Sequence, residues 1–119
     1  MPNDEFTFEA PATVEGVSVA RTFIASMAIA CAVDPDTAAD LGLAVAELAS
    51  VIVAHDPPEP LAIRGHRNHD FLVLALTPWP TDALDVDDAD RWDLVTALFS
   101  SATVADGVAH LSTEPILEP

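Results

Sequence analysis

The chain has no lysine and only four arginines, against twenty acidic residues among its 119. Its formal net charge is −16 at pH 7, with histidine counted as neutral. A surface of this sign repels nucleic acid and anionic lipid at long range, so we expect neither as a partner. A basic protein is the kind of partner that such a charge attracts. The alternative is that the composition reflects a high-GC or salt-adapted genome and serves only solubility.

Cysteine is nearly lacking too, and so are the signals of export. The single cysteine, Cys31, cannot form an internal disulfide, which favours a reducing compartment. The first ten residues, MPNDEFTFEA, carry acids where a secretory signal carries Lys or Arg. The longest nearly uncharged apolar stretch, residues 23–33, is shorter than the roughly 20 residues of a membrane-spanning helix. We expect one cytoplasmic domain spanning residues 1–119.

Hydrophobic periodicity predicts the elements of the first two thirds. Phe6 and Phe8 alternate with polar residues, as in a strand, and Pro11 ends it. Apolar residues then recur at helical spacing, and Asp34 and Asp36 are candidate caps for a second helix. The predicted elements are a strand at 5–9, helices at 13–33 and 36–55, and strands at 61–64 and 71–76 joined by a polar turn at 67–70.

The remaining third predicts a loop, a helix and a hairpin. Residues 81–90 carry five aspartates and read as a solvated loop that ends in a helix cap. Trp92, Val95, Leu98 and Phe99 then form a third helical stripe. Asp106-Gly107 is the strongest hairpin signal in the chain, because glycine tolerates the positive φ of a type I′ turn. The strands expected beside this turn are 102–104 and 108–111.

The resulting order, β-α-α-β-β-α-β-β, predicts an α+β two-layer sandwich: a mixed or antiparallel sheet with helices on one face. The 71–76 strand is apolar on both faces. Either a symmetric partner buries its second face, or it is a central strand under a short loop.

One glutamate stands out in the second helix. On a helical projection of AVAELASVIVAH, residues 44–55, Glu47 lies beside a core-facing stripe that runs from Leu41 to His55 and includes Val51. Asp40 lies along the same border as Glu47. A lone carboxylate in this place is either an ordinary exposed residue, which we favour, or a catalytic group.

The chain resembles the anti-sigma-factor serine-kinase branch of the GHKL ATPase superfamily. The resemblance rests on the element order, on AVAELASVIVAH, on the hairpin after it and on the closing ADGVAHLST, and it covers nearly the whole chain. It implies a histidine-kinase-like ATPase fold and a motif E-x-x-x-N followed by a basic residue or His. In that family the Glu activates a water or hydroxyl, and the Asn holds Mg²⁺ at the nucleotide. By position Glu47 matches the Glu, Val51 the Asn, and His55 the later basic residue.

The chain departs from this family at three places. Val51 has no lone pair for Mg²⁺, which requires oxygen ligands. No glycine lies between Gly65 and Gly107, whereas the family places an Asp-x-Gly-x-Gly box and a Gly-rich lid there. In their place stand Thr77-Pro78-Trp79-Pro80 and the acid run Asp82–Asp90, which would repel a polyphosphate. We therefore expect the ATP and Mg²⁺ site to be lost, with no catalytic residue.

Other groupings of reactive residues are weak. The histidines of His66-Arg67-Asn68-His69, with His55 and His110, lack the arrangement of a metal site, so we expect no metal. The acid run lacks the glycine and terminal glutamate of a calcium loop. Trp79 is either an exposed anchor for a partner or a residue folded over the core.

Three functions follow from these observations. The first is a non-catalytic regulatory module of anti-sigma-like fold that binds a sigma factor or another basic regulator, with a homodimer as one arrangement. The second is a divergent ATP-binding serine kinase in which Glu47 is the base and Asp40 or the Asp82–Asp90 run supplies metal ligands. The third is an acidic mimic of nucleic acid, which requires its carboxylates along one face.

Overall fold

The computed structural model describes residues 5–68, 71–80 and 86–113, and these residues form three helices and one five-stranded sheet. The elements in chain order are β1 (Glu5–Ala10), α1 (Val14–Ala30), α2 (Pro35–Ala54), β2 (Leu61–Asn68), β3 (Phe71–Thr77), α3 (Val86–Thr96), β4 (Ser101–Ala105) and β5 (Val108–Ser112). The α+β class is confirmed, and the described elements follow one another as β-α-α-β-β-α-β-β.

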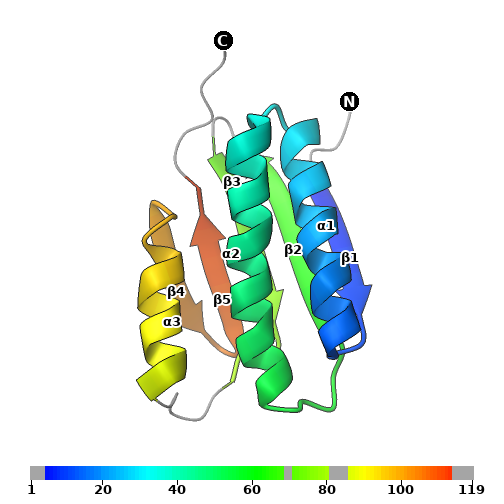
Figure 1. Ribbon diagram of the computed structural model, residues 1–119, viewed down its shortest axis with the longest axis vertical. Helices are drawn as coiled ribbons and strands as arrows, with labels where there is room; N and C mark the ends of the chain where they lie inside the picture. The colour runs from blue at the N-terminus through cyan, green and yellow to red at the C-terminus, as the bar shows by residue number, and fades with distance from the viewer. Residues whose placement is uncertain (1–4, 69–70, 81–85, 114–119) are drawn as a thin grey trace.

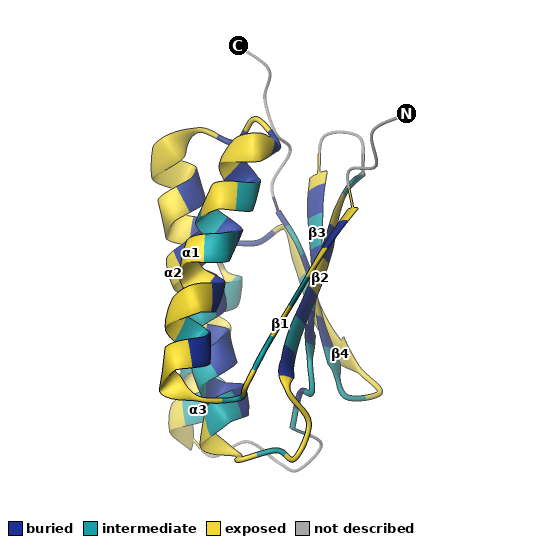
Figure 2. Ribbon diagram, turned by 90° about the vertical axis from the view of Figure 1, so that its right-hand side faces the viewer, coloured by how far each residue is buried: buried dark blue, intermediate teal, exposed yellow. Residues whose placement is uncertain are grey.

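The sheet is antiparallel throughout, with the strand order β1-β2-β3-β5-β4. All three helices cover one face of it, with α2 between α1 and α3 (Figure 1). The other face carries no helix (Figure 2). The molecule is therefore a two-layer sandwich whose sheet is covered on one side only.

Side chains on alternate strand positions build the core between the two layers. Leu72, Leu74 and Leu76 of β3 are fully buried under the helices. Val73 and Ala75 point to the open face and are only partly buried. Such alternation is ordinary for an antiparallel sheet with one covered face. β3 is thus a central strand, and within this single chain nothing described covers its second face.

Gly42 and Gly65 lie where neighbouring elements pack closely. A Cβ at Gly42 would lie 2.8 Å from the carbonyl oxygen of Arg21, so α1 and α2 pack closely there. A Cβ at Gly65 would lie 2.2 Å from Cζ of Phe6, because the Phe6 ring covers this glycine from the neighbouring strand. Phe6 also packs edge-on against Phe23 of α1, with 5.6 Å between ring centroids.

The predicted end of β2 and the predicted start of α3 are wrong. β2 continues to Asn68, so Arg67 and Asn68 lie in the strand and not in a turn, paired with Leu72 and Phe71. α3 begins at Val86, inside the acid run that we expected to be a loop. Acids suit this position because the N-terminal end of a helix carries a partial positive charge. His69, Asp70, Asp82 and Asp85 lie outside the described residues.

The hairpin between β4 and β5 forms as predicted. Asp106 and Gly107 have φ angles of 53° and 75°, the positive values that a type I′ turn requires. All three helices end earlier than predicted: α1 ends at Ala30, α2 at Ala54 and α3 at Thr96, so Leu98 and Phe99 of the expected third stripe lie beyond the helix.

α2 is also long and apolar enough to cross a bilayer, with a mean hydropathy of 1.7 over its most apolar window. Half of that window is buried inside the protein, as in the core helix of a soluble domain, so length and composition are weak indications here.

Asp34 caps α2. Its carboxylate accepts hydrogen bonds from the backbone N–H groups of Asp36, at 3.4 Å, and Thr37, at 3.0 Å, and from the Thr37 hydroxyl. The Thr37 hydroxyl and backbone bonds hold the pKa of Asp34 below its ordinary value of 3.8, because they favour the charged form. The cap and Pro35 together fix where the helix begins.

We expect Asp34→Ala to lower the melting temperature at about pH 6, and by less as the pH falls to about 3. The folded-state pKa of Asp34 is depressed, so its contribution is full above the unfolded-state value and is lost as the pH falls through the folded-state value. Thermal melts followed by circular dichroism at several pH values test this. Asp40→Ala is the control, since Asp40 is exposed on the same helix and caps nothing; an equal loss there would contradict the assignment.

Candidate functional site

The residues that sequence reasoning selected lie on the side of α2 that faces α3. Glu47, Val51 and His55 follow one another at intervals of four residues. Each such step turns a side chain by about 40° around the helix axis. The three side chains therefore have different surroundings, although they lie along one edge of the helix.

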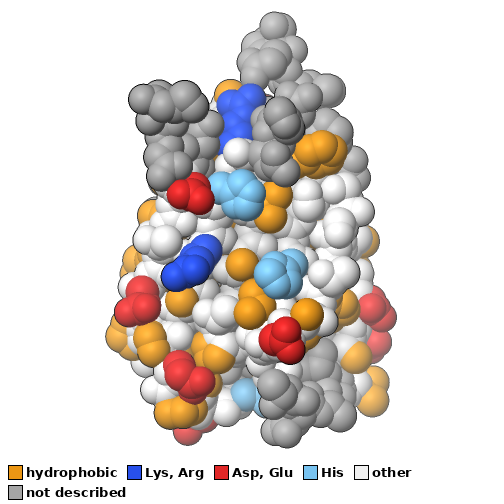
Figure 3. Space-filling model, turned by 180° about the vertical axis from the view of Figure 1, so that it is seen from behind, with side chains coloured by type: hydrophobic (Ala, Val, Ile, Leu, Met, Phe, Trp, Pro, Cys, Tyr) orange, Lys and Arg blue, Asp and Glu red, His pale blue; other side chains and the backbone are white. Residues whose placement is uncertain are grey.

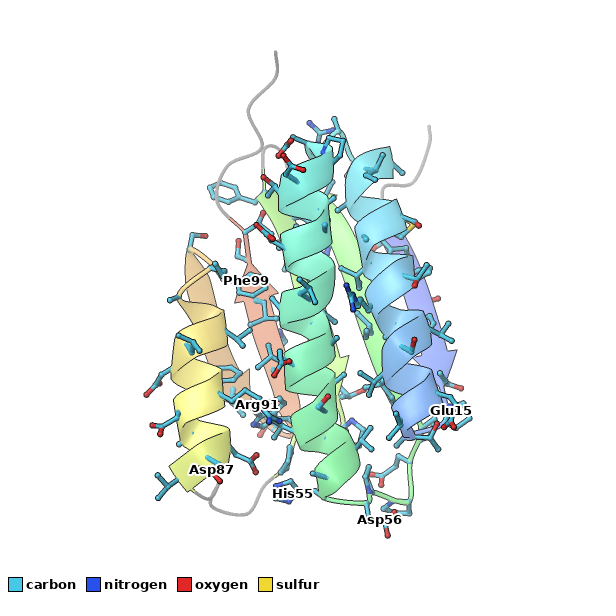
Figure 4. The ribbon with its side chains drawn as sticks, viewed as in Figure 1. Glu15, His55, Asp56, Asp87, Arg91 and Phe99 are labelled. Atoms are coloured by element: carbon cyan, nitrogen blue, oxygen red, sulfur yellow. The ribbon has the colours of Figure 1, made fainter. Side chains whose placement is uncertain are left out.

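Glu47 is exposed and paired. Its Oε2 atom lies 3.2 Å from Nε of Arg91, which extends from α3 toward α2 (Figure 4). The Glu47 side chain is 55% exposed and that of Arg91 38%. An ion pair this exposed contributes about 0–1 kcal/mol to folding. The expectation that Glu47 is an exposed residue is confirmed, and its charge is already compensated by a neighbouring helix.

Val51 is fully buried. It belongs to the core cluster together with Leu48 and Ile52 of the same helix. The position that would carry the Mg²⁺ ligand in the resembled family is thus part of the hydrophobic core of this chain. An oxygen-bearing side chain there would be removed from water without a designed partner.

His55 is not part of the buried stripe, where the sequence placed it. α2 ends at Ala54, and His55 is the C-terminal cap. Because the helix does not continue through position 55, the His55 side chain is exposed and does not join the buried stripe. Its Nε2 atom lies 3.4 Å from Oδ2 of Asp88 in the first turns of α3. His55 and Asp88 therefore form a second polar link between α2 and α3, next to that of Glu47 and Arg91.

The segment after β3 is packed and not open. Trp79 is 4% exposed, and its ring lies 5.1 Å from that of Trp92 on α3. Its backbone N–H donates to the carbonyl of Gly107 at 2.7 Å. Of the two alternatives for Trp79, the residue folded over the core is the correct one. The aromatic pair fills the space between the end of β3 and α3.

The remaining candidates are scattered. Asp40 lies about 10 Å along α2 from Glu47 and is exposed. His66 and His110 project from the open face of the sheet, by register with Glu5 and Ala75. Among the described residues no group of three or more His, Cys, Asp or Glu could hold a metal ion.

The open face of the sheet has a hollow of its own. Its volume is about 650 Å³, and its lining includes Thr7, Arg64, Ala75 and His110, which form one row across β1, β2, β3 and β5. Arg64 is exposed and makes no ion pair or hydrogen bond through its side chain in the described part of the chain. Figure 3 shows this face, with side chains of both charges among apolar ones.

Sequence reasoning missed Arg91, which turns out to be the partner of Glu47. The only available signal for this ion pair was that cations are scarce, since the chain has four arginines and twenty acids. A comparison with models of known protein families gives no match, and no curated protein matches the chain significantly. With no relative to compare, what the α2–α3 surface can do is inferred from its own side chains.

We expect Val51→Asn to destabilise the fold by about 2–4 kcal/mol, because it removes buried methyl groups and buries an amide. Glu47→Gln is the matched control at the exposed end of the same turn, and we expect it to cost at most about 1 kcal/mol. Urea unfolding of both variants measures the difference. Equal effects would show that position 51 is not a core position.

Proposed function

We propose that this chain is a non-catalytic regulatory module with a histidine-kinase-like ATPase fold, which acts by protein–protein contact and has lost the nucleotide site. The order of elements, with a long second helix in the middle of the helix layer, is consistent with the resemblance to anti-sigma serine kinases. In such a module the fold is kept, and other residues stand at the positions where the family binds its nucleotide.

The buried Val51 is the observation that carries the proposal. In the resembled family this helix supplies an oxygen ligand to the magnesium nucleotide, and the matching position here is closed inside the core. One turn earlier, Glu47 is held in an exposed ion pair with Arg91, at 3.2 Å, whereas a general base for phosphoryl transfer must reach the attacking hydroxyl.

The segment after β3 supports the same conclusion. Pro78 and Pro80 restrict the backbone, and Trp79 is packed on Trp92. The family's glycines at such a place let the backbone approach a nucleotide closely. Together with the four aspartates of α3, this segment offers a triphosphate neither backbone donors nor a favourable potential.

The acidic surface favours a basic protein, such as a sigma factor or another DNA-binding regulator. Asp36, Asp40 and Glu47 lie on α2, and four more acids lie on α3. Glu5 and Glu9 lie on the opposite layer, in β1. This spread over both layers does not favour a nucleic-acid mimic, which needs its carboxylates along one face.

We expect no binding of Mg²⁺·ATP in isothermal titration calorimetry of the intact chain, because Val51 is buried where the resembled family has its metal ligand and prolines stand where it has glycines. A histidine kinase domain of known affinity serves as the positive control. Clear micromolar binding would contradict the proposal and favour the divergent serine kinase. In that event Glu47→Gln should abolish phosphate release while leaving nucleotide affinity largely unchanged.

The proposal includes a second copy of the chain against the open face of the sheet. Val73 and Ala75 supply an apolar centre there, and Phe71 is 37% exposed on the same face. Arg64 and the acids of β1 give this face both charges, as a self-complementary contact requires.

We expect light scattering after size exclusion to give twice the 12.5 kDa chain mass. Ala75→Lys should shift the protein to the monomer, since it places a cation between Arg64 and His110 at the centre of the face. Val19→Lys, on the exposed side of α1, is the control and should leave the dimer intact. A wild-type monomer at high concentration would refute this part of the proposal.

A further inference from the structure

The outward side of α3 carries a ridge of three exposed side chains, two of them apolar and the middle one acidic. Val86, Asp90 and Leu94 follow one another at intervals of four residues and so lie along one line of the helix. Val86 is 75% exposed and Leu94 78%. The opposite side of α3 is already used, because Val95 is buried and Trp92 packs on Trp79.

Carboxylates edge this ridge on both sides. On a helical projection, Asp87 lies on one side of the line and Asp93 on the other, with Asp90 within it. The side chains of these three aspartates make no ion pair or hydrogen bond among the described residues. By contrast, the α3 groups that face α2 are paired, Asp88 with His55 and Arg91 with Glu47.

The pattern is more specific than a solvated helix requires. A helix that only shields the core needs polar residues on its outer side, and solubility does not call for an exposed Leu and Val in line. The only cation of α3, Arg91, is turned inward and is held by Glu47. What remains outward is a ridge about 12 Å long with Val86 and Leu94 at its ends and Asp90 between them, flanked by Asp87 and Asp93; none of these three carboxylates is paired among the described residues.

We propose that this face of α3, formed by Val86, Asp87, Asp90, Asp93 and Leu94, docks a cationic amphipathic helix of a protein partner. The proposal rests on the function proposed above and assigns the surface that recognises the basic partner. An apolar stripe on the partner helix packs over Val86 and Leu94, as ridges pack into grooves between helices. Lysines or arginines beside that stripe meet the three aspartates.

A helix is favoured over other occupants by the spacing. The ridge repeats every four residues, which matches the side-chain rows of a helix and not the alternation of a strand. Nucleic acid is repelled by the same three carboxylates. The ridge is short, so most of the discrimination comes from Leu94 at its C-terminal end and from the sign of the neighbouring charges.

The test uses the intact chain and a labelled synthetic peptide of about 18 residues with Leu on one helical stripe and Lys beside it. A second peptide has the same composition in an order that breaks the stripe. We expect fluorescence anisotropy to show about tenfold tighter binding of the amphipathic peptide. Leu94→Gln should weaken that binding about tenfold, because it removes one of the two apolar contacts of the ridge.

Matched controls separate this face from charge alone. Ile29 on α1 is 53% exposed and has no acid within four residues, so Ile29→Gln should leave binding within about twofold of the wild type. The double variant Asp90→Asn with Asp93→Asn should weaken binding and make it less dependent on salt. Since these side chains are exposed, the variants should melt like the parent, which circular dichroism checks.

Equal affinity for the two peptides, or equal loss in Leu94→Gln and Ile29→Gln, would overturn the assignment of this face. So would the failure of both peptides to bind. If the chain binds neither the peptides nor Mg²⁺·ATP, the docking surface on α3 is refuted and the proposed non-catalytic function stands. If it binds Mg²⁺·ATP, the proposed function is refuted whatever the result with the peptides.

Discussion

Burial of one stripe of α2 against the sheet is the interaction on which the other features depend. Leu48, Val51 and Ile52 are fully buried, and burying a side chain of this size contributes about 1.5–3 kcal/mol. This burial fixes the rotation of the helix. Glu47 then emerges at the border toward α3, within reach of Arg91, while the next turn carries Val51 inward. The burial of Val51 and the exposure of Glu47 are two results of the same rotation.

Much of the architecture could be predicted because it is local. The periods of 3.6 and 2 give the element order, and Asp106-Gly107 gives its turn from φ preference alone. The end of β2 could not, since its polar residues resemble a turn until the pairing of Arg67 with Leu72 is known. The start of α3 was hidden for a similar reason: aspartates suit both a loop and the first turn of a helix.

The candidate site was only partly predictable. The exposure of Glu47 follows from the helical projection, but its pairing with Arg91 depends on how α3 docks, which no spacing in the sequence reveals. His55 was misplaced because a projection assumes that the helix continues, whereas α2 ends at Ala54. Trp79 allowed two interpretations until the position of Trp92 decided between them. Contacts between segments that are distant in the sequence could not be predicted from its local patterns.

The ring of Phe6 over Gly65 joins an edge strand to its neighbour through a side chain on one and a bare backbone on the other. The two residues depend on each other: a larger residue at 65 would displace the Phe6 ring, and a smaller residue at 6 would leave Gly65 uncovered. Over evolutionary time the two positions are therefore bound to change together. In a set of related chains, correlated substitution at this pair would report the pairing of β1 with β2 more directly than either residue's own variability.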